Sequence, residues 1–253
     1  MKIHHYPLFL SMSTLECKNC NSVVDGNFCS QCGQATNTHR INALYFLHDI
    51  PHSVFHVDKG FPYTFYQLIK RPALALDEYL DGRRVRYYRP LSYVLIMSAI
   101  CVLIVSRIRI YMQELQQHLG QGSPHTSFLS HYQAIFIFLM IPLAGGITWL
   151  VFRKNKYNFW EHFLINTYLA AQLNVLLVLI NIFSLFKYLI TGSASYSITI
   201  FMTVFMVYYA FTFSGLMNTG KKGFSFGLKL GLMCFLLSSV YITAMIFAGI
   251  TTG

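Results

Sequence analysis

The sequence predicts an all-α membrane protein, built as a five-span helical bundle with interfacial amphipathic helices and a small N-terminal ribbon. Composition supports this class, because 55% of the 253 residues are hydrophobic and only 11% are charged. Soluble domains usually have about 25% charged residues. Five apolar stretches are also long enough to cross a hydrocarbon core, which takes ~20 helical residues. Most of the chain is therefore expected to lie in lipid.

Residues 1–14 are predicted to be an N-terminal extension without a defined role. Their apolar stretch is too short for the core of a signal peptide, and no small-residue cleavage pattern follows it. The sequence allows either Met1 or Met12 as the start of translation.

A zinc ribbon is predicted over residues 15–36, because four cysteines form two C-x-x-C pairs: Cys17, Cys20, Cys29 and Cys32. Four thiolates fill a tetrahedral coordination sphere, which is typical of a structural site that holds one zinc ion. A redox-active dithiol is the alternative, but it needs a thioredoxin-like βαβ context that the sequence lacks. In a compartment that keeps thiols reduced, this spacing favours metal over disulfides.

Residues 41–90 are predicted to form an amphipathic, basic-aromatic segment at the membrane interface. Its first half carries His48, His52 and His56 at every fourth position, with Asp58 close by. On a continuous helix these side chains would share one face and could form a second metal site or a protonation switch. Pro51 disturbs that register, so a hydrated helix face without a specific ligand is the alternative.

The second half of this segment mixes cations with aromatic rings, which suits the headgroup layer of a membrane. Its cations are predicted to contact headgroups or phosphate: Lys59, Arg71, Arg83, Arg84, Arg86 and Arg89. We expect Pro72 to split the segment and Asp81-Gly82 to form a turn before the first span. The net charge of +10 is therefore assigned to anionic headgroups at the cytoplasmic face rather than to nucleic acid.

The region around this segment also carries a resemblance to a known family. The features are the four cysteines, His48, His56, Asp58-Lys59-Gly60, Arg71-Pro72, Tyr79, Gly82, Arg83 and Pro90. With them, the chain resembles a family of bacterial inner-membrane proteins with an N-terminal zinc ribbon, catalogued as a domain of unknown function. The resemblance implies this architecture and a place in the bacterial cytoplasmic (inner) membrane. It supplies no catalytic residue.

The transmembrane domain is expected over residues 91–250, with spans at about 91–111, 132–152, 163–186, 196–217 and 226–250. Lysine and arginine gather before the first span, between the second and third, and between the fourth and fifth. Because positive loops stay inside, the N-terminus is expected in the cytoplasm and the C-terminus outside.

The third expected span carries a polar stripe that includes Asn166, Asn174 and Asn181. An advance of about 100° per residue places these amides on one side of the helix. The stripe indicates either a substrate path or hydrogen bonds to the fourth or fifth span. No ionisable residue lies in the middle of any expected span, which argues against an ion-coupled transporter.

Two functions are compatible with these features. The first is an integral membrane scaffold or accessory subunit, not an enzyme, that recruits a cytosolic protein partner through its zinc ribbon. Residues 15–36 contain a single basic residue, Lys18, and so have too little positive charge to favour binding of nucleic-acid phosphates. The alternative is a lipid- or phosphate-handling membrane enzyme or carrier that uses the His, Asp and Arg cluster. No spacing in that cluster matches a known nucleophile or metal-hydrolase motif, so no catalytic residue is assigned.

Overall fold

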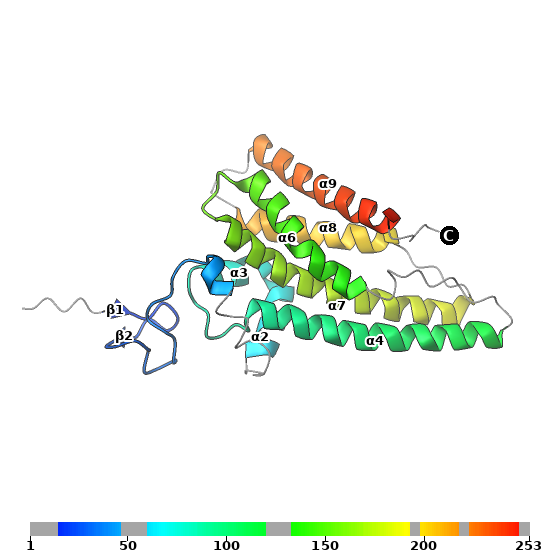
Figure 1. The fold of residues 1–253 in the computed structure, drawn as a ribbon, viewed down its shortest axis with the longest axis horizontal. Helices are drawn as coiled ribbons and strands as arrows, with labels where there is room; N and C mark the ends of the chain where they lie inside the picture. The colour runs from blue at the N-terminus through cyan, green and yellow to red at the C-terminus, as the bar shows by residue number, and fades with distance from the viewer. Residues whose placement is uncertain (1–14, 47–59, 120–132, 193–197, 218–222, 248–253) are drawn as a thin grey trace, which may run out of the picture.

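The computed structural model describes residues 15–46, 60–119, 133–192, 198–217 and 223–247. This part of the chain is mostly helical. The long helices lie side by side, and the cysteine-bearing ribbon sits at one end of them (Figure 1). Two short helices lie between the ribbon and the bundle.

The ribbon is built on two tight hairpins. Strand β1 (Leu15–Glu16) pairs antiparallel with β2 (Val23–Val24), so that Leu15 lies opposite Val24. A single bridge between Phe28 and Ala35 forms the second hairpin.

Helices α2 (Gly60–Lys70) and α3 (Pro72–Leu80) follow one another with a break at Arg71. Proline cannot donate the backbone hydrogen bond of a helix interior, but its fixed φ suits the first turn, and Pro72 occupies that place in α3. The chain then turns at Gly82, whose φ of +106° is readily adopted only by glycine.

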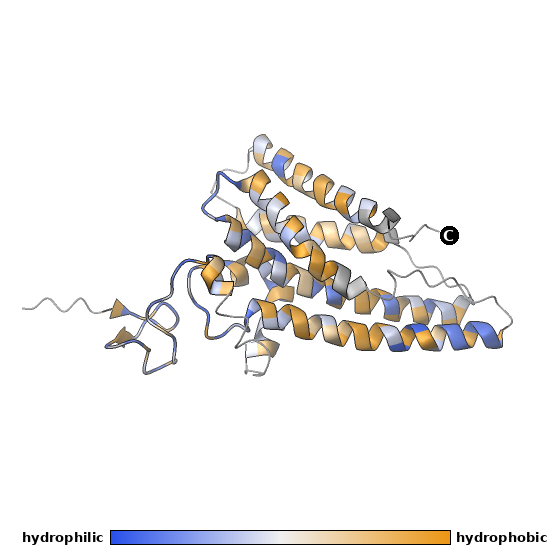
Figure 2. Ribbon diagram, in the orientation of Figure 1, coloured by the Kyte–Doolittle hydropathy of each residue, from blue (hydrophilic) through white to orange (hydrophobic). Residues whose placement is uncertain are grey.

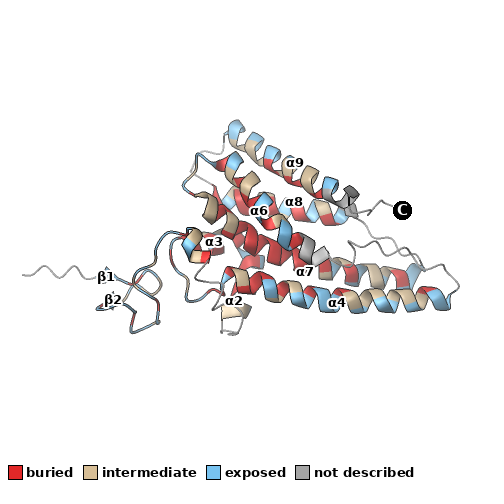
Figure 3. Cartoon of the chain, in the orientation of Figure 1, coloured by how far each residue is buried: buried red, intermediate tan, exposed pale blue. Residues whose placement is uncertain are grey.

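Within the described residues, the bundle consists of five longer helices: α4 (Pro90–His118), α6 (Gln133–Phe152), α7 (Phe159–Thr191), α8 (Ile198–Leu216) and α9 (Phe224–Phe247). Helix α7 lies at the centre, where α4, α6 and α8 pack against it. Its first half is almost completely buried (Figure 3). Large apolar side chains cover the outward faces of the bundle (Figure 2), as expected of helices that face lipid.

Three of these helices are long and apolar enough to cross a membrane: Pro90–His118, Phe159–Thr191 and Phe224–Thr243. The apolar helices Ile137–Phe152 and Ile200–Leu216 are shorter. Only the described residues enter this comparison. By length and composition, the structure therefore supports three of the five predicted spans.

The helix ends differ from the predicted spans most clearly at α7, which begins at Phe159 rather than at residue 163. Asn158 explains the early start, because its side chain accepts a hydrogen bond from the Glu161 amide and the Glu161 carboxylate accepts one from the Asn158 amide. This reciprocal pair is a capping box. At the other end, Gly192 closes the helix with a φ of +67°.

Several aromatic rings predicted at the headgroup layer lie inside the protein instead. Tyr79, Tyr87 and Tyr88 are buried. The Tyr79 ring packs edge-on against Tyr87 and Tyr168, and the Tyr168 hydroxyl donates to the Tyr88 carbonyl oxygen. Leu68 of α2 is buried as well, so the apolar faces of α2 and α3 pack against the rest of the protein.

Helices α4 and α7 run in the same direction. Gln172 on α7 donates to the Tyr93 hydroxyl on α4 at 2.9 Å, and Asn174 donates to the Ser98 hydroxyl at 2.9 Å. Both residue numbers rise together along the interface, so the two helices are parallel. The chain must return between them, and α6 provides that return (Figure 1).

Candidate metal centre

The four cysteines lie on two turns that repeat the same backbone geometry. In the first turn the Cys17 amide donates to the Ser22 carbonyl, and the Asn21 amide donates back to Cys17. In the second turn the Cys29 amide donates to the Gln34 carbonyl, and the Gly33 amide donates back to the Cys29 carbonyl. The residue after each second cysteine has a positive φ, +59° at Asn21 and +74° at Gly33. These left-handed residues turn each C-x-x-C back on itself and aim both thiols inward.

The four sulfur atoms converge on one point. The Sγ atoms of Cys17 and Cys32 are 3.6 Å apart, those of Cys20 and Cys29 are 3.5 Å apart, and all four lie within 4.8 Å of one another. A Zn–S bond of ~2.3 Å gives a tetrahedral edge of ~3.8 Å. The described cysteines are free thiols rather than disulfides. Their spacing therefore fits one tetrahedral metal ion.

Polar neighbours favour a thiolate at Cys20. Its sulfur lies 3.3 Å from the Ser22 hydroxyl, and hydrogen bonds with the side chain and the backbone of Ser22 lower the pKa of Cys20 to about 6. Burial has the opposite effect on Cys32 and raises its pKa to about 11. A metal ligand must be the thiolate rather than the thiol. Ser22 therefore prepares one of the four ligands for a cation.

The ribbon is docked against the turn that joins α3 to α4. The Gln34 side chain is only 4% exposed, and its Oε1 accepts from the backbone amide of Arg84 at 3.0 Å and from that of Val85 at 3.5 Å. The first cysteine turn touches the same place, because a Cβ at Gly82 would lie 3.0 Å from Cδ of Lys18. Both halves of the ribbon thus contact the α3–α4 turn.

Arg84 holds the same turn to the linker that follows the ribbon. Its guanidinium donates to the His39 carbonyl oxygen at 2.8 Å and lies over the rings of Tyr45 and Tyr79. The Tyr45 and Tyr79 hydroxyls are 2.5 Å apart. A cation over two aromatic faces, with hydrogen bonds, is a structural contact, so Arg84 is engaged within the protein.

A second anchor joins the linker to the start of α7. Arg40 donates from Nε and Nη2 to the two oxygens of Glu161, both at 2.8 Å, and also to the Lys156 carbonyl oxygen. The Asn158 side chain donates to the carbonyl oxygen of Ile41 at 2.9 Å, and Ile41 is fully buried. A bidentate arginine–carboxylate pair fixes orientation as well as distance, so this linker is held rather than free.

Asp77 on α3 ties the α6–α7 connection to the same end of the molecule. Its carboxylate accepts from Lys156 Nζ at 2.7 Å and from the Tyr157 hydroxyl at 2.5 Å. Partial burial tends to raise the pKa of Asp77, but these bonds outweigh it and hold the pKa below the usual value. The stabilisation is therefore present above the unfolded pKa and is lost as the pH falls through the lower folded value.

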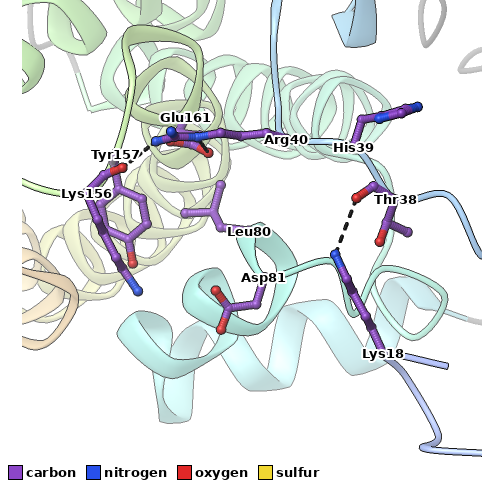
Figure 4. A pocket seen from close by; sticks show the side chains of 9 residues that line it. All are labelled: Lys18, Thr38, His39, Arg40, Leu80, Asp81, Lys156, Tyr157 and Glu161. Atoms are coloured by element: carbon purple, nitrogen blue, oxygen red, sulfur yellow. Dashed lines mark hydrogen bonds and ion pairs between the residues drawn. The ribbon is translucent and has the colours of Figure 1, made fainter. Parts of the chain in front are cut away.

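A cavity of about 240 Å³ lies between the ribbon, α3 and the start of α7 (Figure 4). Its walls include the cations Lys18, Arg40 and Lys156 and the carboxylates Asp81 and Glu161. Each of the three cations has a hydrogen-bond partner within the protein. The cavity is therefore a polar interface between two docked parts, and none of the five predicted headgroup cations that the structure describes lines it.

The predicted headgroup cations separate into two groups. Arg83, Arg86 and Arg89 are exposed at the ribbon end of the bundle. Arg71 bonds to Gln67, and Arg84 is engaged as described. Lys59 lies outside the described residues, as does the predicted histidine cluster: His48, His52, His56 and Asp58.

The polar stripe of α7 lies inside the bundle. Asn166 donates to the Thr148 hydroxyl of α6 at 2.9 Å and accepts from the Tyr209 hydroxyl of α8 at 3.2 Å. Asn174 bonds to Ser98 of α4, and Asn181 bonds to the carbonyl oxygen of its own helix. The stripe thus makes hydrogen bonds between helices, with partners on α4, α6 and α8.

Sequence patterns did not single out the residues that dock the ribbon. Gln34 and Arg40 contact positions 50 and 121 residues away, and such long-range contacts leave no local pattern. One signal was available, because Asn158 and Glu161 have the N-x-x-E spacing of a capping box. It would have marked the start of α7.

The fold and the site define a helical protein with three helices that could cross a membrane and a four-cysteine centre that could hold a metal ion. Residues 58–102 match a family model described as "Protein of unknown function (DUF3667)". The match takes in α2, α3, the docking turn and the first part of α4. No curated protein matches the chain, and no solved structure matches it.

Proposed function

We propose that this protein is a membrane-embedded scaffold or accessory subunit that holds a zinc ribbon in a fixed position and presents it to a cytosolic protein partner. One observation carries the proposal: the ribbon is docked, with Gln34 buried and bonded to the α3–α4 turn. A module that only needed to be near the membrane could be tethered by a flexible linker. A docked module offers a partner a surface of fixed orientation, which lowers the entropy cost of binding.

The metal in this proposal is a single zinc ion with a structural role. Four convergent sulfurs fill a tetrahedral sphere and leave no position for a substrate or a reactive water. Thiolate ligands also select zinc over the hard cations calcium and magnesium. Small ribbons of this kind gain much of their folding free energy from the metal.

The proposal includes five membrane crossings. Because α4 and α7 run in the same direction, a chain that crosses in both must return between them, and α6 is the returning helix. Helix α6 has 20 residues and α8 has 19, which at 1.5 Å per residue give lengths of about 30 Å and 29 Å. Both lengths match a hydrocarbon core of ~30 Å.

The ribbon end is proposed to face the cytoplasm, with the C-terminus outside, in a bacterial inner membrane. Exposed cations gather at this end, namely Arg83, Arg86, Arg89, Arg153 and Lys154. Connections rich in lysine and arginine stay on the cytoplasmic side. The same cations then lie at the level of anionic headgroups, each contributing ~1 kcal/mol of attraction near the surface.

The ribbon carries apolar side chains that a protein partner could cover. Leu15, Val23 and Phe28 are 61%, 64% and 68% exposed, which is a large share of the apolar side chains in a module of this size. Aromatic residues of this kind are enriched at protein interfaces. The three cations that line the cavity, by contrast, are each paired within the protein, which favours a structural role for this part of the described chain.

Photo-crosslinking in intact membranes tests the proposal. A photoreactive phenylalanine analogue at Phe28 is expected to capture one defined cytosolic protein, and the same analogue at Val23 is expected to capture the same protein. Phe224, an 85% exposed phenylalanine at the same end of the bundle, is the matched control and is expected to capture none of it. Phe28→Ser should abolish co-purification of that protein while zinc content stays unchanged. Capture of lipid alone from both ribbon positions would refute the scaffold function.

A further inference from the structure

We infer that metal binding in the ribbon controls the structure of the α3–α4 turn, so that this turn is ordered when zinc is bound and released when it is not. The inference rests on the zinc site of the proposed function. It adds a regulatory property, because the turn carries the exposed arginines Arg83 and Arg86 and leads directly into the first membrane helix.

The coupling begins at the second cysteine turn. Gln34 lies two residues after Cys32, and its carbonyl oxygen accepts from the amide of Cys29 at 2.8 Å. A metal bound to both cysteines therefore fixes the backbone of Gln34. Without the metal a ribbon of this size loses its fold, and the position of Gln34 is lost with it.

The coupling ends at two backbone amides. Arg84 and Val85 both donate to Oε1 of Gln34, so one side chain satisfies two amides of the turn. Arg84 is half-buried and Val85 is exposed, so water can replace Gln34 at both amides. When Gln34 leaves, these two amides lose their protein acceptor and their protection from solvent, and the turn loses the contact that ties it to the ribbon.

A second contact makes the same coupling from the first cysteine turn. Lys18 lies between Cys17 and Cys20, and its Cδ would be 3.0 Å from a Cβ at Gly82. The Thr38 Oγ1 would be 2.8 Å from the same Cβ. Side chains on and just after the ribbon therefore pack closely against position 82, and both cysteine turns meet the α3–α4 turn.

Hydrogen exchange of the full chain in nanodiscs of neutral phosphatidylcholine tests the inference. Removal of zinc with a chelator is expected to speed exchange of the Arg84 and Val85 amides at least about tenfold, while helices α6 and α8 stay unchanged. Gln34→Ala should give the same fast exchange with zinc still bound, as measured by native mass spectrometry. Gln31→Ala, which changes an exposed glutamine of the same cysteine turn, is the matched control and should behave like the parent.

Gly82→Ala changes the α3–α4 turn instead of the ribbon, so every ribbon residue keeps its side chain. A side chain at a φ of +106° strains the turn by itself, so faster exchange at Arg84 and Val85 is expected with or without zinc. The deciding measurement is zinc affinity, obtained by chelator competition. Because coupling between two sites is reciprocal, straining a turn that zinc orders should weaken zinc binding. If Gln34→Ala fails to hold zinc, the zinc affinity of Gly82→Ala decides the question.

The outcomes separate the two proposals. Zinc that binds without changing exchange at Arg84 and Val85 would overturn the inference and leave the scaffold function standing. Normal protection of these amides in zinc-loaded Gln34→Ala, or an unchanged zinc affinity of Gly82→Ala, would overturn it as well. A full chain that binds no zinc would contradict the zinc centre of the proposed function and the inference together.

Discussion

Single residues at the ribbon end serve two elements at once. Glu161 is the clearest example, because its carboxylate accepts from the Arg40 guanidinium and also caps the amide of Asn158. Its side chain is only 5% exposed, whereas that of Arg40 is 60% exposed. The cap and the ion pair therefore depend on one buried carboxylate, and losing it affects both the start of α7 and the docking of the linker.

Glu161→Ala should lower the free energy of unfolding by roughly 1–2 kcal/mol, because it removes a helix cap and a partly exposed ion pair. The measurement is unfolding in mixed micelles, followed by loss of helical circular dichroism. Glu114→Ala, at an exposed glutamate of α4, is the control and should change stability by less than about 0.5 kcal/mol. Equal stability of the two variants would show that Glu161 is not an anchor.

At this scale the sequence predicts what local spacing encodes. Two C-x-x-C pairs place four cysteines in a metal-binding arrangement because each pair closes its own turn. The roles of Gln34 and Arg84 could not be predicted, because the hydrogen bond between them joins residues 50 positions apart. An arginine beside a membrane span has the same sequence context whether it meets a headgroup or a tyrosine ring.

Among the elements, α3 and α8 make a close contact through small residues. Gly215 of α8 faces Ala73 of α3, and a Cβ at Gly215 would lie 2.5 Å from the Cβ of Ala73. Small residues at both positions let the two backbones approach. The contact places α3 against the bundle rather than flat on a lipid surface.

Gly215→Ala is therefore expected to destabilise the bundle by ~1–3 kcal/mol, the usual cost of overpacking. Gly231→Ala in α9 is the control, because a Cβ at that position meets no atom within 4 Å. It should be neutral or slightly stabilising, since alanine favours helix more than glycine does. Thermal unfolding of both purified variants measures the difference, and a neutral Gly215→Ala would mean that α3 and α8 can separate without cost.

Element boundaries followed from the sequence where one residue fixes the backbone. Pro72 and Gly82 are such residues, and the break and turn lie where they were predicted. The direction in which α2 and α3 face did not follow, because an amphipathic pattern is the same toward lipid and toward protein. Tyr79 and Tyr88 face the protein, and only the packed structure reveals it.

On the scale of the whole molecule, charge is distributed unevenly between the two ends. The cationic α3–α4 turn, the α6–α7 connection and the ribbon share one end of the bundle (Figure 1). The hydrogen bonds from Lys156 and Arg40 keep these segments together. The proposed membrane orientation rests on this asymmetry, since positive connections stay in the cytoplasm.

A fluorescent reporter that folds only in a reducing cytosol tests this orientation. Fused after Gly253 it should stay dark, because five crossings place the C-terminus outside. Fused to a chain that ends after Lys156 it should fluoresce, because two crossings bring that position back to the cytoplasm. Fluorescence from the full-length fusion would contradict the proposed topology, and equal protein levels on immunoblots control for expression.

Helix α7 is a single long helix at the centre of the molecule. Its 33 residues form a continuous helix of about 50 Å, longer than the hydrocarbon core of ~30 Å. Glu161, which clamps the N-terminal module, and Thr191, near the opposite end, therefore belong to one rigid body. In the proposed topology, a displacement of the ribbon that moves Glu161 would therefore also move the end of α7 on the opposite side of the membrane.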